Sequence, residues 1–391
     1  MKSLIHLFLI TVFLAALGQI ASDIYLPSLP YMVHALHTNT SLVQFTVAAF
    51  MLGFCMPRLV YGITSDAFGR KTPLLIGLLI CLIGGIICSL AFNVWMVIVG
   101  RLLQGLGAAA GVTVTGAMVR DCFEGADLAK FESYRAATIV TVLSCIPLLG
   151  GYIQHYLNWR ANFIATLIYT IFVLGLFFLL PETNQHKDAS HVKPKYIKEN
   201  TKTLLGNKHY LAYGVCIFMS YAGILAWLTL GPILLQNSLH FSSVQFGWAA
   251  MVVGISYVIG ALTNGKLVKR FGMHCMLKTA TYVLITSALF LILFAMLGVL
   301  NIYVILIPVA FFVMGTGLVF ANAYTGALTP FPKIAGLACS ILGTLQILGG
   351  FIASSAISIL PDTSQMPLAV IILICAISCF IAAKIGMRSD I

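Results

Sequence analysis

The stretch YGITSDAFGRKTPL, residues 61–74, separates two long apolar segments and follows the spacing GxxxDxxGRK. Its two glycines permit close approach and a tight turn, because glycine has no Cβ. Asp66 is placed to face a helix N-terminus, and Arg70 is placed to bind a carboxylate such as Asp121. Alone, this pattern is an ordinary charged turn, so its meaning depends on the segments around it.

The composition indicates a membrane protein. Hydrophobic residues make up 60% of the 391 residues and charged residues only 8%, with a mean hydropathy of +1.01, whereas soluble domains carry roughly 25% charged residues. The first apolar run exceeds the length of a signal peptide and has no small-residue cleavage site before Asp23, so we expect a retained helix. The ten cysteines form neither a CxxC pair nor a Cys/His cluster, which gives no indication of a disulfide framework or a metal site.

Apolar stretches long enough to span ~30 Å of hydrocarbon recur along the whole chain. The sequence predicts an all-α polytopic membrane protein with twelve transmembrane helices, over residues 4–36, 41–64, 73–91, 94–119, 134–155, 161–181, 209–236, 243–265, 276–298, 302–328, 335–360 and 367–386. Of the 22 lysines and arginines, 19 fall in alternate loops or tails on the side of the N-terminus. The positive-inside rule then places both termini in the cytoplasm. The net charge of +11 follows this distribution, so we expect no nucleic-acid partner.

One long polar stretch, residues 182–208, divides the chain into two six-helix halves, 1–181 and 209–391, and is expected to be a cytoplasmic linker. The halves echo each other in their glycines, at offsets of 203 and 210 residues: Gly62 and Gly69 recur as Gly265 and Gly272, and Gly105 and Gly107 recur as Gly315 and Gly317. A parallel repeat of this kind is typical of transporters whose two halves rock around a site at the membrane midplane.

Asp23, in the stretch DIYLPSLP, is the only carboxylate that the hydropathy pattern puts inside the membrane. An acid within lipid costs on the order of a few kcal/mol and therefore indicates function, although it could also cap or hydrogen-bond a helix. All nine histidines fall near the ends of the predicted helices. Burial favours the protonated form of an acid and a nearby arginine favours its carboxylate, so movement between such surroundings would load and release a proton.

The fourth predicted helix contains GRLLQGLGAAAG, in which Arg101 and Gln104 stand among small residues that allow tight helix packing. Arg101 falls in the outer half of its span. It needs a polar partner or water there, unless its side chain extends to the outer surface. The fifth helix contains PLLGG, residues 147–151, which predicts a kink.

These motifs together resemble those of the major facilitator superfamily. The GxxxDxxGRK loop matches its signature loop, and Arg101 and Gln104 match its RxxQGxG pattern. PLLGG resembles part of its antiporter motif GxxxGPxxGG, although Val142 and Ile146 occupy the two earlier glycine positions.

Three further stretches narrow the resemblance to the Bcr/CflA branch of drug:proton antiporters: DIYLPSLP, NWRANF and ALTPFPKIAGLACSILGTLQ. Arg120 and Asp121, which follow the fourth helix, add to it. The resemblance runs from about Gly18 to beyond Pro361 and covers most of the chain.

The resemblance implies roles for residues of this sequence. Proton coupling is implied for Asp23 and Arg101. Conformational gating is implied for Gly62, Asp66, Gly69, Arg70, Lys71, Arg120, Asp121, Pro147, Gly150 and Gly151. Substrate contacts are expected from polar and aromatic residues on the cavity-facing sides of helices 1, 4, 7 and 10, with the candidates Gln19, Tyr25, Gln104, Thr113, Met219, Tyr221, Trp227, Asn322, Tyr324 and Gln346.

Pro57 and Arg58 depart from that branch, whose members usually have a small residue followed by glutamine here. The proline is expected to kink the second helix. Arg58 could act as a charge partner of Asp23, recognise an anionic substrate, or extend to the inner surface two turns away.

The sequence therefore predicts a multi-pass antiporter of the bacterial inner membrane, which exports drug-like amphipathic small molecules in exchange for protons by alternating access. An exporter of one metabolite, such as a siderophore, is the alternative. HExxH, GxSxG and paired membrane acids are absent from the sequence, so we expect no enzyme activity. We expect a monomer in the lipid bilayer, with no cofactor and with the proton gradient as its energy source.

Overall fold

The computed structural model describes residues 2–123, 131, 134–135, 138–139, 141, 144–184, 194–362 and 364–388. Every regular element within these ranges is helical. The elements are α1 (Lys2–Asp23), η1 (Leu26–Ser28), α2 (Leu29–Ala35), α3 (Thr40–Cys55), α4 (Arg58–Phe68), α5 (Lys71–Ser89), α6 (Val94–Cys122), α8 (Ile146–Tyr156), α9 (Trp159–Phe178), α10 (Pro194–Gly206), α11 (Lys208–Ile233), η3 (Leu234–Ser238), α12 (Ser243–Phe271), α13 (Met273–Met296), α14 (Ile302–Leu328), η4 (Pro332–Ile334), α15 (Ala335–Ile359) and α16 (Met366–Arg388).

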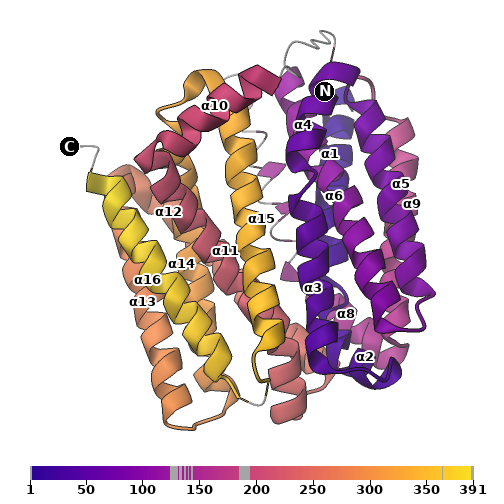
Figure 1. The fold of residues 1–391 in the computed structure, drawn as a ribbon, viewed down its shortest axis with the longest axis vertical. Helices are drawn as coiled ribbons and strands as arrows, with labels where there is room; N and C mark the ends of the chain where they lie inside the picture. The colour runs from indigo at the N-terminus through magenta and orange to yellow at the C-terminus, as the bar shows by residue number, and fades with distance from the viewer. Residues whose placement is uncertain are drawn as a thin grey trace.

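Eleven helical segments within the described residues are long and apolar enough to cross a membrane. The helix expected over residues 134–155 is represented by α8 at its end, and much of its earlier part lies outside the described residues. The all-helical prediction is confirmed, whereas the count of twelve stays a prediction. Figure 1 shows the two ends of the chain at the same end of the molecule, as an even number of crossings requires. The side of the membrane that this end faces stays a prediction.

Side-chain caps explain where several helices begin. A polar side chain precedes each of these helices and accepts a hydrogen bond from a backbone N–H of the first turn, which would otherwise lack a partner. Five of the caps are Asn39, Asn93, Asn158, Asn207 and Asn301, before α3, α6, α9, α11 and α14. Ser242 and Gln245 form a reciprocal capping box at the start of α12.

Prolines interrupt the first two membrane spans. α1 ends at Asp23, and the chain continues through η1 and α2, each of which has a proline in its first turn. The second span is interrupted at Met56 and Pro57, so α4 begins at Arg58. Proline has no N–H to donate and disfavours helical geometry in the residue before it. The expected kink at Pro57 is confirmed, and both Asp23 and Arg58 stand at helix ends.

The helices form two groups, with α1 to α9 on one side of the molecule and α11 to α16 on the other (Figure 1). Part of the expected linker, residues 185–193, lies outside the described residues, so the domain boundaries stay predictions. The two groups meet at the end opposite the termini. There Gln236 Nε2 donates to the Pro27 carbonyl at 3.0 Å, and Ser243 Oγ donates to the Gly151 carbonyl at 3.0 Å.

Glycines allow α6 to pack backbone to backbone against two neighbouring helices. A Cβ on Gly105 would collide with the Phe50 carbonyl and lie 2.8 Å from the Phe54 nitrogen, both in α3. A Cβ on Gly107 would collide with Gly77 and Cys81 of α5. Small residues therefore give α6 its central place in the first group, as the sequence predicts.

The packing of α6 on α3 has a counterpart in the second group, where α14 packs on α12. The glycines that correspond in this packing are not the ones that the expected offset of 210 residues pairs. Gly317 approaches the Tyr257 carbonyl of α12, where its Cβ would lie 2.6 Å away, much as Gly105 approaches that of Phe50 in α3. Gly315 instead faces Leu284 of α13. Equivalent packing thus pairs Gly105 with Gly317, so the prediction from the repeated glycine pairs was wrong by two residues.

The expected offset of 203 residues does hold in the loops that follow α4 and α12. Gly69 ends α4 with φ 96°, and Gly272 ends α12 with φ 80°. A residue with a Cβ is strained at such angles. Both loops therefore need glycine for the turn that the sequence predicts.

Alanine at position 105 is expected to lower the thermal unfolding temperature of the purified protein, because the added methyl group must push α6 away from α3. Overpacking of this kind costs about 1–3 kcal/mol. Gly175→Ala in α9 is the matched control, since a Cβ there would meet no atom within 4 Å. Unfolding is measured for both variants and the wild type in one detergent. An unchanged unfolding temperature for Gly105→Ala would contradict the close packing.

Candidate functional site

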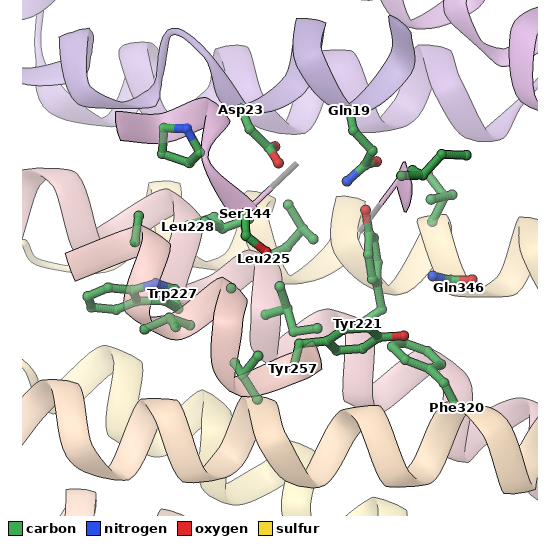
Figure 2. A pocket seen from close by; sticks show the side chains of 18 of the residues that line it. Gln19, Asp23, Ser144, Tyr221, Leu225, Trp227, Leu228, Tyr257, Phe320 and Gln346 are labelled. Atoms are coloured by element: carbon green, nitrogen blue, oxygen red, sulfur yellow. The ribbon is translucent and has the colours of Figure 1, made fainter. Parts of the chain in front are cut away.

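A cavity of about 420 Å³ lies between the two groups of helices. Figure 2 shows Gln19 and Asp23 extending into it from α1, with Tyr221 and Gln346 of the second group on the other side. Most of its lining is apolar or aromatic. These residues come chiefly from α11, α12 and α14: Ile224, Leu225, Trp227, Leu228, Ala250, Val253, Tyr257, Val313 and Phe320.

Asp23 is the last residue of α1 and is 8% exposed. Its carboxyl lines the cavity. Among the described residues, both recorded ion pairs belong to Arg70. Asp23 is therefore a cavity-facing acid without a direct arginine contact in this arrangement.

Arg101 is fully buried behind α1 and does not extend to the outer surface. Its Nη1 donates to the Ala21 carbonyl at 2.6 Å and to Gln104 Oε1 at 3.1 Å. Its Cζ lies 4.2 Å from the ring centroids of both Tyr25 and Phe50. The aromatic faces and a carbonyl from the last turn of α1 compensate for part of the lost water, while Nε and Nη2 of Arg101 are buried without a hydrogen-bond partner among the described residues. Arg101 thus holds the end of α1 without lining the cavity.

Arg58 turns into the molecule. Its Nη1 donates to the Gly343 carbonyl of α15 at 2.8 Å, and its Cζ lies 5.7 Å from the Phe54 ring centroid. The side chain also lines the cavity. Of the three alternatives, extension to the inner surface is wrong, because the break at Pro57 directs the first residue of α4 towards α15.

Four of the ten expected substrate contacts line the cavity: Gln19, Tyr221, Trp227 and Gln346. Tyr324 lies behind them and supports one, since its hydroxyl donates to Gln346 Oε1 at 2.8 Å. The cavity therefore brings together polar candidates from α1, α11 and α15.

The other five expected contacts do not line the cavity. Tyr25 and Gln104 surround the buried guanidinium of α6, and Asn322 donates to a side chain of α12 at 2.7 Å. Thr113 and Met219 lie outside the lining as well. A polar residue in an apolar helix therefore proved as often to be part of the packing as part of the cavity wall.

The prediction also chose the wrong helices in part. α6 contributes only Val112 to the lining, whereas α12, the eighth expected span, contributes Ala250, Val253, Gly254 and Tyr257. Arg135 and Ser144, from the fifth expected span, were missed as well. Tyr257, which follows Gly254 by three residues in α12, is the feature of the sequence that could have indicated a cavity-facing side. Pairs of this kind are common in apolar helices, so the indication is weak.

Arg70 joins the end of α4 to the end of α6. Its Nε and Nη2 donate to the two carboxylate oxygens of Asp121 at 2.8 and 2.9 Å, and its Nη1 donates to Ser65 Oγ at 2.9 Å and to Asp66. The expected contact between Arg70 and Asp121 is confirmed. The carboxylate of Asp66 accepts a hydrogen bond from Arg70, and its expected position facing a helix N-terminus stays a prediction.

Glu182 binds the N-terminus of α5. Its carboxylate accepts the backbone N–H groups of Arg70 at 2.9 Å and Lys71 at 3.2 Å, at the start of α5. Asn184 donates to the Asp66 carbonyl at 2.9 Å. Both residues belong to the stretch 182–208, which was expected to be a linker. An acid soon after a membrane helix was the signal that this prediction missed.

The remaining gating candidates surround this network. Lys71 Nζ lies 5.2 Å from the Phe177 ring centroid, and Arg120 Nε donates to the Gly116 carbonyl at 3.2 Å. A Cβ on Gly62 would lie 4.0 Å from the side chain of Thr113 in α6, which is an ordinary contact distance. The signature loop therefore ties α4, α5, α6 and the segment after α9 together within the first group.

The PLLGG segment connects the two groups of helices. A Cβ on Gly150 would collide with the Ile24 carbonyl just after α1, and one on Gly151 would lie 2.5 Å from the Ser243 carbonyl of α12. Pro147 stands in the first turn of α8 and lines the cavity. The motif position of Val142 lies outside the described residues. The glycines of α8 thus permit backbone contact with both groups.

Comparisons with known proteins agree with this arrangement. The family described as Major Facilitator Superfamily matches residues 8–354. A bicyclomycin resistance protein homolog of Haemophilus influenzae is 29% identical over 363 residues, which cover 91% of this chain and 89% of that protein. Multidrug resistance protein D of Escherichia coli is 28% identical over 362 residues, which cover 92% and 90%. The expected resemblance to the Bcr/CflA branch is confirmed. Within that branch, the Gly18 and Gln19 pair and the stretch LPDTSQ, residues 360–365, resemble multidrug resistance protein D, also called EmrD.

Solved structures share the fold. The crystal structure of a D-xylose-proton symporter matches with a TM-score of 0.76 at 16% identity, covering 96% of this chain and 97% of that one. The partially occluded inward-open xylose transporter XylE of Escherichia coli matches with a TM-score of 0.77 at 15% identity, covering 99% and 98%. The chain is therefore a multi-pass membrane transporter and not an enzyme, and it belongs to the Major Facilitator Superfamily.

Proposed function

We propose that this transporter exports drug-like amphipathic small molecules across the bacterial inner membrane in exchange for protons. The observation that carries the proposal is that Asp23, which can gain and lose a proton, lines the central cavity. The names of the two relatives, a bicyclomycin resistance protein homolog and a multidrug resistance protein, support a drug-like cargo.

Proton and cargo compete at Asp23 in this proposal. A proton and a cationic group of the cargo each neutralise the same carboxylate, so binding of one weakens binding of the other. Arg101 stays charged throughout, because a guanidinium does not lose its proton in proteins. Its bond to the Ala21 carbonyl holds the end of α1 in place while the charge of Asp23 changes. Exchange follows if the cavity opens to one side of the membrane at a time.

The cavity lining suits amphipathic cargo. Apolar and aromatic side chains such as Leu225, Trp227 and Phe320 cover most of the wall, and Gln19 and Gln346 offer polar contacts from opposite groups of helices. Small-molecule sites commonly combine an apolar wall with a few polar groups that set the orientation. The alternative of a single metabolite cargo has the same fold and the same coupling.

We propose that the contacts between the two groups open alternately. The hydrogen bonds of Gln236 and Ser243 join the groups at the end opposite the termini. A second connection between the groups is the hydrogen bond from Arg58 of α4 to Gly343 of α15, at the wall of the cavity. The Arg70 network keeps the first group rigid during this motion. In this proposal the transporter works as a monomer with its termini in the cytoplasm, and the proton gradient is its energy source, without a cofactor.

Asp23→Asn is expected to abolish proton-driven uptake of an amphipathic dye into inverted membrane vesicles, because the amide cannot exchange a proton. Asp362→Asn, in the loop between α15 and α16, is the matched control and is expected to transport normally. Thermal unfolding checks that both variants are folded. Transport by Asp23→Asn at the wild-type rate, with the same dependence on the pH gradient, would refute the coupling role.

Trp227 offers a direct test of where cargo binds, since it is fully buried and lines the cavity. An amphipathic amine that carries a nitroxide is expected to quench tryptophan fluorescence saturably, and Trp227→Phe is expected to remove most of that saturable component. Trp248→Phe is the control, because Trp248 lies outside the lining and is 48% exposed. Saturable quenching that survives in Trp227→Phe would place the binding site elsewhere.

A further inference from the structure

The guanidinium of Arg58 is held at the wall of the cavity by Gly343 and Phe54, which are together called its seat. The Gly343 carbonyl accepts a hydrogen bond from its Nη1 at 2.8 Å, and the missing side chain of Gly343 leaves room for the guanidinium. A Cβ there would lie 3.0 Å from Nη1 and 3.1 Å from Cζ. The Phe54 ring, 5.7 Å from Cζ, lies on another side. The seat therefore fixes the position of a permanent positive charge.

The seat leaves most of the hydrogen-bonding capacity of Arg58 unused. A guanidinium has five N–H donors, and the recorded bond to Gly343 uses one. Neither ion pair recorded among the described residues includes Arg58. A planar guanidinium with free donors matches the two oxygens of a carboxylate. The geometry therefore suits a carboxylate supplied from the cavity.

Three charged side chains line the cavity within the described part of the chain: Asp23, Arg58 and Arg135. Arg135 has more than one partner: its Nη1 donates to Thr115 Oγ1 at 3.3 Å, and the residue makes a further contact. Tyr221 lines the same cavity as Asp23 and Arg58. The cavity wall therefore carries one acidic side chain and two cationic ones, of which Arg58 has the fewer partners.

The separation of these two charges follows from helix geometry. Phe54, one turn before Arg58, packs so closely on Gly18 that a Cβ there would lie 2.7 Å from the ring. Gly18 precedes Asp23 by five residues of α1, or about 7.5 Å of helix rise. Asp23 therefore lies about 7.5 Å along α1 from the contact with Phe54, and Arg58 follows Phe54 by four residues, so the two charges occupy separate parts of the cavity wall.

Proton exchange limits which charged cargo fits this cavity. A cargo with only a negative charge would bind better when Asp23 is protonated, so cargo and proton would assist each other and would not compete. A cargo with only a positive charge would compete with the proton but would be repelled by Arg58. A cargo with both charges satisfies both conditions, because its cation competes for Asp23 while its anion binds the arginine.

We propose that the transporter carries zwitterionic amphipathic molecules, whose carboxylate binds Arg58 while a cationic nitrogen on the far side of an apolar body binds Asp23. This substrate class rests on the proposed exchange of cargo for protons. The carboxylate site is a specificity site added to that exchange, on a different helix from the proton site.

The test uses three probes with one apolar skeleton. A piperazinyl fluoroquinolone is a zwitterion at neutral pH, its methyl ester is a cation, and its N-acetyl derivative is an anion. Binding of each probe to purified transporter in lipid nanodiscs is measured by calorimetry, which needs no proton gradient. The variants are Arg58→Gln, Arg58→Lys and Asp23→Asn, and Arg270→Gln is the control because that cation lies outside the cavity lining.

The wild type is expected to bind the zwitterion most tightly. Arg58→Gln is expected to weaken binding of the zwitterion and the anion about tenfold to a hundredfold, because one charged hydrogen-bonded contact is lost. Binding of the methyl ester is expected to stay the same or to become a few fold tighter, because the repulsion between Arg58 and the cation is removed. Arg58→Lys, which keeps the charge without the planar fork, is expected to fall between the wild type and Arg58→Gln. Asp23→Asn is expected to weaken the zwitterion and the ester and to spare the anion.

Three results would overturn the proposal. These are zwitterion affinity that Arg58→Gln leaves unchanged, equal loss of zwitterion and ester binding in that variant, and no binding of any probe to the wild type. Failure of the underlying exchange is distinguishable, because it is measured as gradient-independent transport by inverted vesicles. Altered binding in Arg58→Gln with normal dye export by that variant would separate cargo recognition from proton coupling.

Discussion

The organisation around the cavity depends on one constraint: a charge kept within the membrane must find its compensation inside the protein. Arg101 meets this constraint with two aromatic faces and the Ala21 carbonyl, at 2.6 Å. That carbonyl lies in the last turn of α1, where helix geometry leaves it without a backbone donor. The break after Asp23 and the buried arginine therefore stabilise each other. Together they present the acid to the cavity at the fixed end of a helix.

Much of this fold was predictable because its causes are local. Composition and apolar run length indicate membrane helices, and the charged loop predicts the bond between Arg70 and Asp121, which the structure contains. The contact of Glu182 with the start of α5 was not predictable, because it depends on where the chain returns after α9. The residues that line the cavity were hard to predict for a similar reason. Whether a polar residue such as Asn322 faces the cavity or a neighbouring helix depends on helix rotation, which a nearly uniformly apolar helix does not reveal.

The glycine register shows why Arg58 was hard to place from sequence. Gly53 packs on α6 and Gly260 packs on α14, and each is followed by the loop glycine of its own half. Sixteen residues separate Gly53 from Gly69, whereas twelve separate Gly260 from Gly272. The first half therefore contains about one additional helical turn. That turn includes the interruption at Met56 and Pro57, after which α4 begins with Arg58. A single fixed offset between the halves hides such an insertion.

The additional turn separates two tasks within one cavity. Asp23 and its support lie on α1 and α6, whereas Arg58 and its seat lie on α4 and α15. Of the charges of Asp23 and Arg58, only that of Asp23 can change during transport, because a guanidinium keeps its proton. In the proposed mechanism, a change at Arg58 thus alters which anions the cavity accepts but leaves the acid and its supporting arginine in place. Energy coupling and cargo recognition can therefore vary independently, provided that the cargo is long enough to reach from one helix pair to the other.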